Sequence, residues 1–387
     1  MSLSVPVSRP SRPVKLTTLA VAGAGLLAVL APAVGAGPQA DAAPGSGWNF
    51  RVSSAPAGVK SGAELAINDK TRKLFITDSF FTMQTKGGSN VSFDFRALQP
   101  GVTKFSITKR KPVGKIDYAP MPWGLMPFGP VPVVPTPQVP DGIGVDNAHS
   151  RIVSTASHAN GVTIVSQNAT TTNASNLLSF PQAHPMGVAV DERSQLAYVA
   201  MNAKNYVSVI DTVKRREVAK ISNIYMPSFL DIDTSRNRLY VGNADYNAKK
   251  TNYLTVVDTR TNAVIKKIPT PSNTRPQVDP ATGKVFAASF DTGKIVVIDP
   301  NSLTVVKTIV TGTTPDKLAI DGQRRLVYTA NLQRKTITVL NADTGAIITT
   351  LRTGAAEHSL VVDEKTGTVF STNHQGGKLT IVSVTKK

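Results

Sequence analysis

The feature that most constrains the fold is an internal repeat with a period of about 42 residues. Seven segments share one form: an apolar-x-apolar stretch ending in Asp or Asn, a polar turn, and then an apolar stretch that in most copies contains an aromatic residue. A large apolar residue follows each acidic or amide anchor by seven positions, as Tyr198, Tyr240 and Tyr328 do. The anchors are Asn68, Asp146, Asp191, Asp233, Asp279, Asp321 and Asp363.

Each unit continues with two more strand patterns. The third strand reads VSVIDT at 207–212 and LTVVDT at 254–259, and the fourth reads REVAKI at 216–221 and LTVVKTI at 303–309. Alternation with period two, interrupted by Asp, Asn, Gly and Pro, is typical of an antiparallel meander. Four strands in one repeat make a propeller blade, so the chain is predicted to be an all-β, seven-bladed β-propeller of four-stranded antiparallel blades.

The last unit ends after its third strand, because Lys387 follows LTIVSV (379–384) almost at once. The strand-like stretch GWNFRV at 47–52 lies just ahead of the first repeat. We expect it to supply the missing outer strand of the last blade, which closes the ring and removes an open sheet edge. The alternative is a frayed N-terminal tail.

At these motifs a family resemblance becomes specific. LYVGN, VYTAN, YVAMN and VFSTN, each followed by a sequence such as VIDT or VVDT, resemble the YVTN-type β-propeller repeat of exported bacterial and archaeal proteins, over about residues 60–387. The resemblance implies a closed toroid. The family includes surface proteins and binding proteins, and more distantly similar propellers are lyases and lactonases. No single catalytic motif defines it, so it implies no active-site residues here.

Residues 1–42 are predicted to be a signal peptide, followed by the propeller at 43–387. Arg9, Arg12 and Lys15 precede an apolar run from Leu16 to Val34, and small residues follow at cleavage sites after Ala36 or Ala42. The alternative, an uncleaved membrane anchor, is disfavoured because Gly and Pro break the run. We therefore expect a secreted, extracytoplasmic monomer with no transmembrane segment after cleavage. The chain has no cysteine, which excludes disulfides and thiolate chemistry.

The first spacing between anchors is far longer than the others, which places two insertions in blade one, at 79–101 and 119–140. Both insertions are predicted on one face, at the mouth of the central channel, and both carry large apolar side chains. Phe80, Phe81, Trp123 and Phe128 are candidate ligand-binding residues of a lid over the mouth. The alternative is a flap that packs over its own blade.

Polar residues are predicted at the same mouth. Asp141, Asp316 and His358 lie where innermost strands begin, and His158, His184 and His374 lie in adjoining loops. Such residues could hold a divalent metal or supply a general base. No HxH or HxxxH spacing is present, however, so we predict a hydrogen-bonded polar lining with no cofactor and no metal ligands, and leave a divalent metal as the alternative.

The opposite face carries the hairpins between first and second strands and is rich in Lys and Arg. With a formal net charge of +18, the chain is expected to attract polyanions such as wall polymers or nucleic acid. Arg215, Arg216, Arg324 and Arg325 are the candidate polyanion-binding residues. The alternative is a charged surface that only keeps the protein soluble.

Three functions remain open. The preferred hypothesis is a secreted binding or scaffold protein, not an enzyme, that engages a ligand or envelope partner at the channel mouth. The first alternative is a metal-assisted lyase or hydrolase of the lactonase or streptogramin-lyase kind. The second is polyanion binding through the basic face alone.

Overall fold

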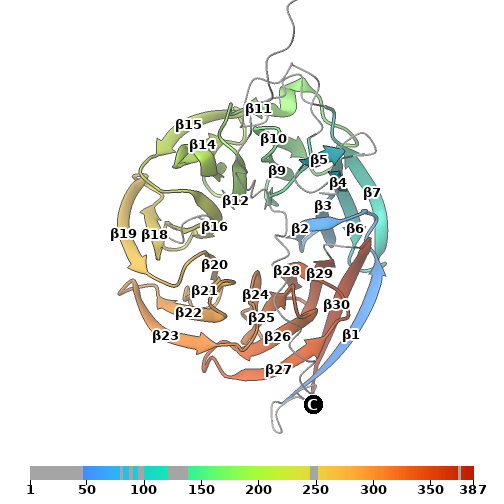
Figure 1. Cartoon of the computed structure of the whole chain (residues 1–387), viewed down its shortest axis with the longest axis vertical. Coiled ribbons are helices and arrows are strands. Elements are labelled where there is room, and N and C mark those ends of the chain that lie inside the picture. Colours follow the sequence, from blue (N-terminus) through green and yellow to red (C-terminus); the bar gives the residue numbers. More distant parts are fainter. Residues whose placement is uncertain are drawn as a thin grey trace, which may run out of the picture. The chain divides into compact units, whose positions relative to one another are not determined.

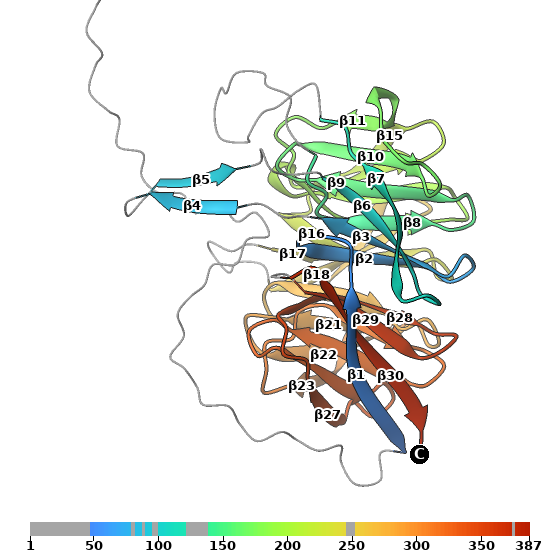
Figure 2. The same ribbon diagram turned by 90° about the vertical axis from the view of Figure 1, so that its right-hand side faces the viewer.

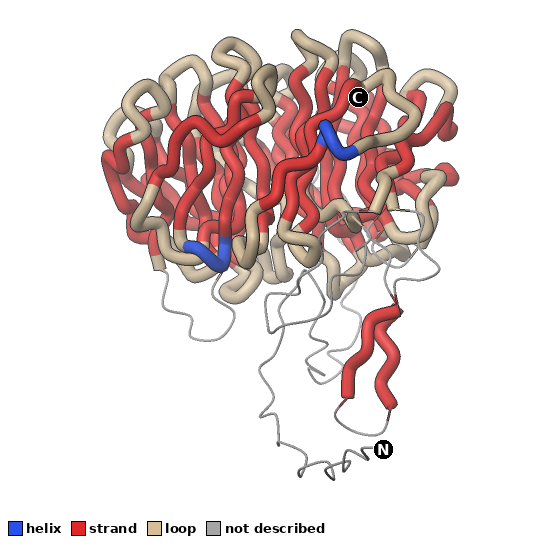
Figure 3. The backbone as a smooth tube through the Cα atoms, turned by 90° about the horizontal axis from the view of Figure 1, so that it is seen from above, coloured by secondary structure: helices blue, strands red, loops and turns tan. Residues whose placement is uncertain are grey.

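The chain forms a ring of seven four-stranded antiparallel sheets around a central axis (Figure 1). The computed structural model describes residues 47–78, 82–86, 90–94, 100–120, 138–244, 252–373 and 376–387. The prediction of an all-β, seven-bladed propeller is confirmed. Two short 3-10 turns, η1 (Ala174–Asn176) and η2 (Asn202–Lys204), are the helical elements of the part described (Figure 3), and no helix there is long and apolar enough to cross a membrane.

The blades follow the chain in order, each running from the innermost strand to the outermost. Blade one is β2 (Gly62–Asn68), β3 (Lys73–Asp78), β6 (Gly101–Ser106) and β7 (Lys111–Asp117). Blade two is β8 (Ile143–Asp146), β9 (Arg151–Ala156), β10 (Gly161–Ser166) and β11 (Leu177–Ser179). Blade three is β12 (Pro185–Asp191), β13 (Leu196–Met201), β14 (Tyr206–Asp211) and β15 (Arg216–Ile221). Blade four is β16 (Pro227–Asp233), β17 (Arg238–Asn243), β18 (Tyr253–Asp258) and β19 (Ala263–Pro269).

The remaining blades complete the circle. Blade five is β20 (Thr274–Val278), β21 (Val285–Ser289), β22 (Lys294–Asp299) and β23 (Thr304–Val310). Blade six is β24 (Leu318–Asp321), β25 (Leu326–Asn331), β26 (Thr336–Asn341) and β27 (Ile347–Arg352). Blade seven is β28 (Glu357–Asp363), β29 (Thr368–Asn373), β30 (Lys378–Lys386) and, as its outer strand, β1 (Trp48–Pro56).

Strand β1 closes the ring, as the sequence predicts. It pairs antiparallel with β30, with Phe50 opposite Val384 and Trp48 opposite Lys386, and the two strands lie side by side in Figure 2. Trp48 and Phe50 are half-buried and pack against an apolar cluster shared by blades six and seven. The closure therefore combines main-chain pairing with apolar burial.

The apolar core lies between consecutive blades. The aromatic residues seven positions after their anchors are fully or almost fully buried, among them Tyr198, Tyr240, Tyr328 and Phe370. Tyr198 of blade three, for example, packs in one cluster with Val241 of blade four. The repeated aromatic position is therefore what joins one sheet to the next.

The anchors cap the hairpins between first and second strands. The side chain of Asp146 accepts a hydrogen bond from the backbone N–H of His149 at 3.0 Å, and Asp233 and Asp321 do the same for Arg236 and Arg324 at 3.1 and 2.9 Å. Asn68 accepts in the same way from Thr71, and Asp191 and Asp279 accept from the backbone two residues on. A side-chain oxygen that bonds the backbone in this way holds a tight turn, which explains the polar residue at these anchors.

The insertion between β3 and β6 contains two further strands, β4 (Thr82–Lys86) and β5 (Asn90–Asp94), which pair with each other. The insertion that follows β7 is fastened at its described ends. Ala119 donates its N–H to Thr172 Oγ1 at 2.9 Å, and the buried Gln138 side chain donates to the Ala119 carbonyl and accepts from Thr163 Oγ1.

Candidate functional site

The channel mouth is the end of the ring where the innermost strands begin. Five ionisable side chains from four blades meet there, and we call them the Asp316 cluster: Glu64 in β2, Arg275 in β20, Asp316 and Lys317 just before β24, and His358 in β28. Consecutive inner strands around the ring supply these residues, so the propeller itself brings together side chains that lie far apart in sequence.

Short contacts link the members of the cluster. Arg275 Nε lies 2.7 Å from Asp316 Oδ1, and Lys317 Nζ lies 2.5 Å from Glu64 Oε2. The His358 ring lies between the two acids, with Nδ1 3.6 Å from Asp316 and Nε2 3.8 Å from Glu64. Ser359 Oγ adds a hydrogen bond to Glu64 at 3.0 Å. The cationic side chains and the His358 ring therefore alternate with the two carboxylates, in the order Arg275, Asp316, His358, Glu64 and Lys317.

The charges of the cluster stabilise both acids in their ionised form. Burial acts to raise the pKa of Glu64, but Lys317, His358 and Arg275 together bring it below its ordinary value. Burial likewise opposes ionisation of Asp316, yet Arg275, His358 and Lys317 lower its pKa. Both side chains are consequently hydrogen-bond acceptors at neutral pH.

Blade four extends this polar lining. Asp231 accepts hydrogen bonds from the Val278 backbone N–H at 2.6 Å and from Gln277 Nε2 at 2.9 Å. Burial outweighs these bonds and raises the pKa of Asp231 to about 6. The guanidinium of Arg275 lies 4.1 Å from the centre of the Phe229 ring, which fixes it over an aromatic surface.

A second polar group lies at the mouth between blades two and three. Ser157 donates both its backbone N–H, at 2.8 Å, and its hydroxyl to Asp141 Oδ2, and its Oγ lies 3.2 Å from His158 Nδ1. The His158 and His184 rings meet edge to face with centroids 5.9 Å apart. Burial, with a further contribution from His158, lowers the pKa of His184 to about 4, against a smaller opposing effect of Asp141.

This arrangement differs from a hydrolase triad. In a triad the carboxylate orients the histidine and the histidine activates the serine. Here the Asp141 carboxylate bonds Ser157 directly. The side chains thus form a hydrogen-bonded lining at the start of blade two.

The structure places the predicted mouth residues in two groups. Asp316 and His358 belong to the Asp316 cluster, whereas Asp141, His158 and His184 belong to the group between blades two and three. Across the described ranges, no three His, Asp or Glu side chains are arranged to hold a metal ion. The remaining candidates, Phe80, Phe81, Trp123, Phe128 and His374, lie outside the described residues.

Sequence reasoning missed Glu64, Arg275 and Lys317. Each stands four residues before its anchor, whereas the strand positions predicted at the mouth, Asp141, Asp316 and His358, stand five before it. A charged residue at the same offset in three different repeats was the signal that could have found them. Asp231 stands two before its anchor and had no comparable signal.

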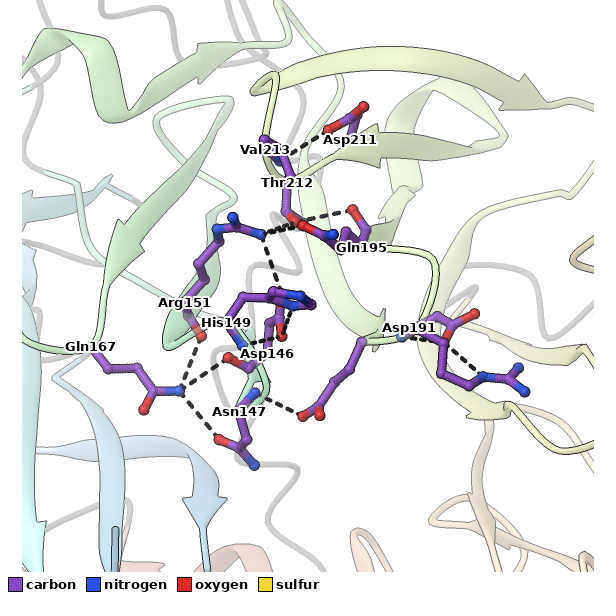
Figure 4. A network of polar contacts seen from close by, with 12 residues as sticks. Asp146, Asn147, His149, Arg151, Gln167, Asp191, Gln195, Asp211, Thr212 and Val213 are labelled. Carbon is purple, nitrogen blue, oxygen red and sulfur yellow. Dashed lines mark hydrogen bonds and ion pairs between the residues drawn. The ribbon is translucent and has the colours of Figure 1, made fainter. Parts of the chain in front are cut away.

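On the hairpin face, arginines bind the anchors and the neighbouring blades. Figure 4 shows Arg151 of blade two reaching Asp146 of its own hairpin and, in blade three, Gln195 Oε1 at 3.0 Å and Thr212 Oγ1 at 3.2 Å. The His149 ring also lies 2.9 Å from Asp146. The face is thus a belt of polar contacts between blades as well as a basic surface.

The four predicted polyanion-binding arginines differ in their surroundings. Arg324 bonds Asp321 at 3.0 Å and the Glu364 carbonyl at 2.8 Å, and Arg325 bonds Asp279 and Asp343. Arg215 and Arg216 are exposed, and Arg215 contacts the Ser175 carbonyl at 3.2 Å. Three of the four therefore bond a neighbouring blade, and Arg215 and Arg216 also present their charge to solvent.

The ring, its four-stranded blades and the closing strand define the chain as a seven-bladed β-propeller of WD40-like architecture. No protein-family model matches the sequence. Over 147 residues, 37% of this chain, it is 26% identical to the uncharacterized protein YncE of Salmonella typhi and equally to YncE of Salmonella typhimurium. The match spans 40% of the length of those relatives. This likeness fits a YVTN-type propeller, and membership of that family stays a prediction.

Among solved structures, the β-propeller domain of Cps50 (Swd1) from Myceliophteria thermophila is similar, with a TM-score of 0.63. The similarity covers 84% of this chain and 97% of that domain at 11% sequence identity. At this identity the likeness concerns the fold alone.

Proposed function

We propose that the chain is a binding propeller that holds a polar ligand at the channel mouth through the Asp316 cluster, without chemical turnover. The observation that carries this proposal is the meeting of Glu64, Arg275, Asp316, Lys317 and His358 from four blades. Each side chain projects from or beside a rigid strand, so the donors and acceptors are positioned before a ligand arrives.

Ionisation of the cluster favours binding over catalysis. General acid–base catalysis works best when a group has a pKa near the working pH. The pKa values of Glu64 and Asp316 are instead lowered by their cationic neighbours. These carboxylates act as fixed acceptors, while Arg275 and Lys317 act as fixed donors. A ligand that complements the cluster carries both hydrogen-bond donors and acceptors. When it binds, it replaces some of the contacts that Arg275 and Lys317 make with Asp316 and Glu64.

The proposal includes export of the protein to the extracytoplasmic space. Cleavage after Ala36 or Ala42 would leave the ring intact, since β1 begins only at Trp48. N-terminal sequencing of protein from the culture medium tests this, with Gly37 or Ala43 as the expected first residue. An intact Met1 on protein found only in the cytosol would contradict export.

Ligand binding is tested by thermal shift against defined probes that carry both charges or several hydroxyls: free amino acids, short peptides and simple sugars. A binding probe is expected to raise the melting temperature of the wild-type protein. Glu64→Gln and Lys317→Met should abolish that rise, whereas Lys266→Ala, on the outer strand β19, should preserve it. A rise that survives both mouth substitutions would contradict binding at the cluster.

The same preparation separates binding from metal-assisted catalysis. Elemental analysis of the purified protein, with His358→Ala as the comparison, measures any bound divalent ion. A stoichiometric ion that is lost on this substitution would replace the binding proposal by the lyase or hydrolase alternative.

A further inference from the structure

A pocket of about 370 Å³ is lined by residues at the outermost strands of blades three and four, β15 and β19. Figure 1 shows these two strands in succession along the outer rim of the ring. The pocket is lined by Lys220, Ile221, Ser222, Asn223, Asn262, Val264 and Lys267. None of these residues belongs to the Asp316 cluster or to the group of Asp141, His158 and His184 at the channel mouth. The pocket therefore calls for an explanation separate from the function proposed above.

At one position of the outermost strand, blades four and five carry a lysine that blade three lacks. Lys266, opposite Val256, donates from Nζ to the Ser302 carbonyl of blade five at 3.1 Å. Lys307, opposite Val297, donates in the same way to the Thr344 carbonyl of blade six. Ala219, opposite Val209, takes this position in blade three. Alanine cannot reach the following turn, so the gap between β15 and blade four stays open.

The turn on the far side of the gap also differs. Leu303 occupies one position of this turn in blade five and is buried in the core of blade four. Asn262 occupies that position in blade four, with the same left-handed backbone, φ 59° against 53°. In place of an apolar plug, blade four thus presents an amide to the pocket.

Two lysines give the pocket its charge. Lys220 and Lys267 take equivalent positions in their blades, opposite Ser208 and Thr255. Their Nζ atoms lie 5.1 and 4.7 Å from the ring centres of Tyr206 and Tyr253. A tyrosine ring restrains an ammonium without neutralising it. Glu217, 3.4 Å from Lys220, offsets one of the two charges, which leaves the site net positive.

An acceptor in the pocket has no partner. Asn262 Oδ1 is buried and accepts no hydrogen bond from any described residue. A buried acceptor without a donor costs free energy that a ligand hydroxyl would recover. Ile221 and Val264 add apolar surface beside it. The volume lies at the low end of the range of about 300–1,000 Å³ for small-molecule sites, so an organic ligand fits better than a bare ion.

We propose that this rim pocket binds a small phosphate ester that carries a free hydroxyl, with glycerol phosphate as the simplest example. The phosphate lies between Lys220 and Lys267, which as compact point charges suit its oxygens. The hydroxyl donates to Asn262 Oδ1, and the carbon atoms contact Ile221 and Val264. The same group occurs free, in a glycerol phosphate polymer and in the headgroup of phosphatidylglycerol.

Isothermal titration of the full chain with glycerol phosphate tests the proposal, with titrations of inorganic phosphate, poly(glycerol phosphate) and phosphatidylglycerol vesicles to identify the source. Saturable binding of glycerol phosphate is expected, and the tightest of the other probes indicates the natural form of the ligand. Lys267→Gln should weaken binding by about tenfold or more, the loss typical of one charged hydrogen bond. Ala219→Lys should have a similar effect because it restores the missing lysine and fills the gap.

Asn262→Gly keeps the left-handed backbone and removes the amide, so it should bring the affinity for glycerol phosphate down to that for inorganic phosphate. Lys266→Ala is the matched control and should leave the affinity unchanged, because the Lys266 side chain leaves β19 toward Ser302 of blade five, where Leu303 fills the turn. The proposal is overturned if none of the probes binds saturably, or if Lys267→Gln and Ala219→Lys both bind as the wild type does. Equal affinity of the wild type for inorganic phosphate and glycerol phosphate would overturn the role of Asn262. Because Glu64→Gln leaves this pocket intact, failure here is distinguishable from failure of the mouth proposal.

Discussion

Arg325 in the first hairpin of blade six forms a two-point ion pair with Asp279 in the first hairpin of blade five, with N–O distances of 3.0 and 2.8 Å. The Asp279 side chain is completely buried, and Arg325 is 23% exposed. Arg72 of blade one binds Asp363 of blade seven in the same two-point manner, at 2.5 Å for each contact. Asp279 and Asp363 thus have two tasks, since each holds the turn of its own hairpin and binds an arginine of the adjoining blade.

Replacing this arginine tests the link between blades. Arg325→Ala leaves the Asp279 carboxylate buried without its cation, and we expect the free energy of unfolding to fall by about 3 kcal/mol, as for other broken buried pairs. Urea denaturation at neutral pH measures the change. Arg215→Ala, at an exposed position, is the control and should stay within about 0.5 kcal/mol of the wild type.

The pair also affects acid stability. Burial opposes ionisation of Asp279, but the hydrogen bonds from Arg325 lower its pKa. Its stabilising effect is therefore complete above the pKa of the unfolded chain and is lost as the pH falls through the lower folded value. Arg325→Ala should lose less stability on acidification than the wild type does, and an identical acid profile would contradict the assignment.

A histidine at the mouth predicts a second pH dependence at milder acidity. The pKa of His184 in the folded protein is about 4, below its ordinary value of 6.5, mainly because of burial. The unfolded chain takes up the proton first, so this contribution is present above about pH 6.5 and is lost as the pH falls toward 4. His184→Asn, which suits the left-handed backbone at φ 49°, should flatten the wild-type decline between about pH 7 and pH 5. Equal slopes for the two proteins in urea titrations would count against a buried neutral histidine.

Ring closure by β1 predicts the effect of N-terminal truncation. Removal of residues 1–46 should leave the melting temperature unchanged, because β1 starts at Trp48. Removal through Pro56 exposes the edge of β30 and the apolar cluster beneath Trp48 and Phe50, and should cause aggregation or a large loss of stability. Calorimetry and size-exclusion chromatography compare the two proteins. A monomeric, equally stable product of the longer truncation would show that the ring does not depend on β1.

The basic face predicts salt-sensitive retention on a polyanion column. Arg215→Glu with Arg216→Glu should reduce retention on heparin while preserving the fold, because both residues are exposed. Reversal of Arg324 and Arg325 should instead destabilise the protein, since both are bound to buried carboxylates. Retention that does not change with the Arg215 and Arg216 substitutions would leave the charge as a solubility feature.

The sequence was sufficient to predict the ring and its closure, because both depend on the period of the repeat. It was insufficient for part of the mouth, and for Glu64 the reason is visible in the strand register. The pairing of β2 with β3 shifts between Gly62 and Leu65, and that of β28 with β29 shifts between Glu357 and Leu360. Such a bulge changes which residues share a face, so a count of five residues back from the anchor does not show that Glu64, four residues back, also reaches the mouth.

Side-chain contacts between blades could not be predicted from the repeat pattern either. The repeat showed a basic hairpin in blade six, but it could not show that Arg325 reaches the anchor of blade five. In the same way, Ala219 is unremarkable in a strand pattern. It matters only because Lys266 and Lys307 reach the following blade from that position.

The pairing of β1 with β30 also determines how the ring responds to mechanical force. Trp48 and Lys386, near the two ends of the described chain, stand opposite each other at the same end of this antiparallel pair, while Ser53 and Ile381, 328 residues apart in sequence, lie farther along it. Tension that pulls the two ends apart therefore loads the Trp48–Lys386 pair first and opens the later pairs one after another, as a zip opens. The same strands pulled along their length in opposite directions would have to break many pairs at once. The ring is closed by the pairing of its first and last strands, so a force that pulls those two strands apart meets the resistance of only one residue pair at a time.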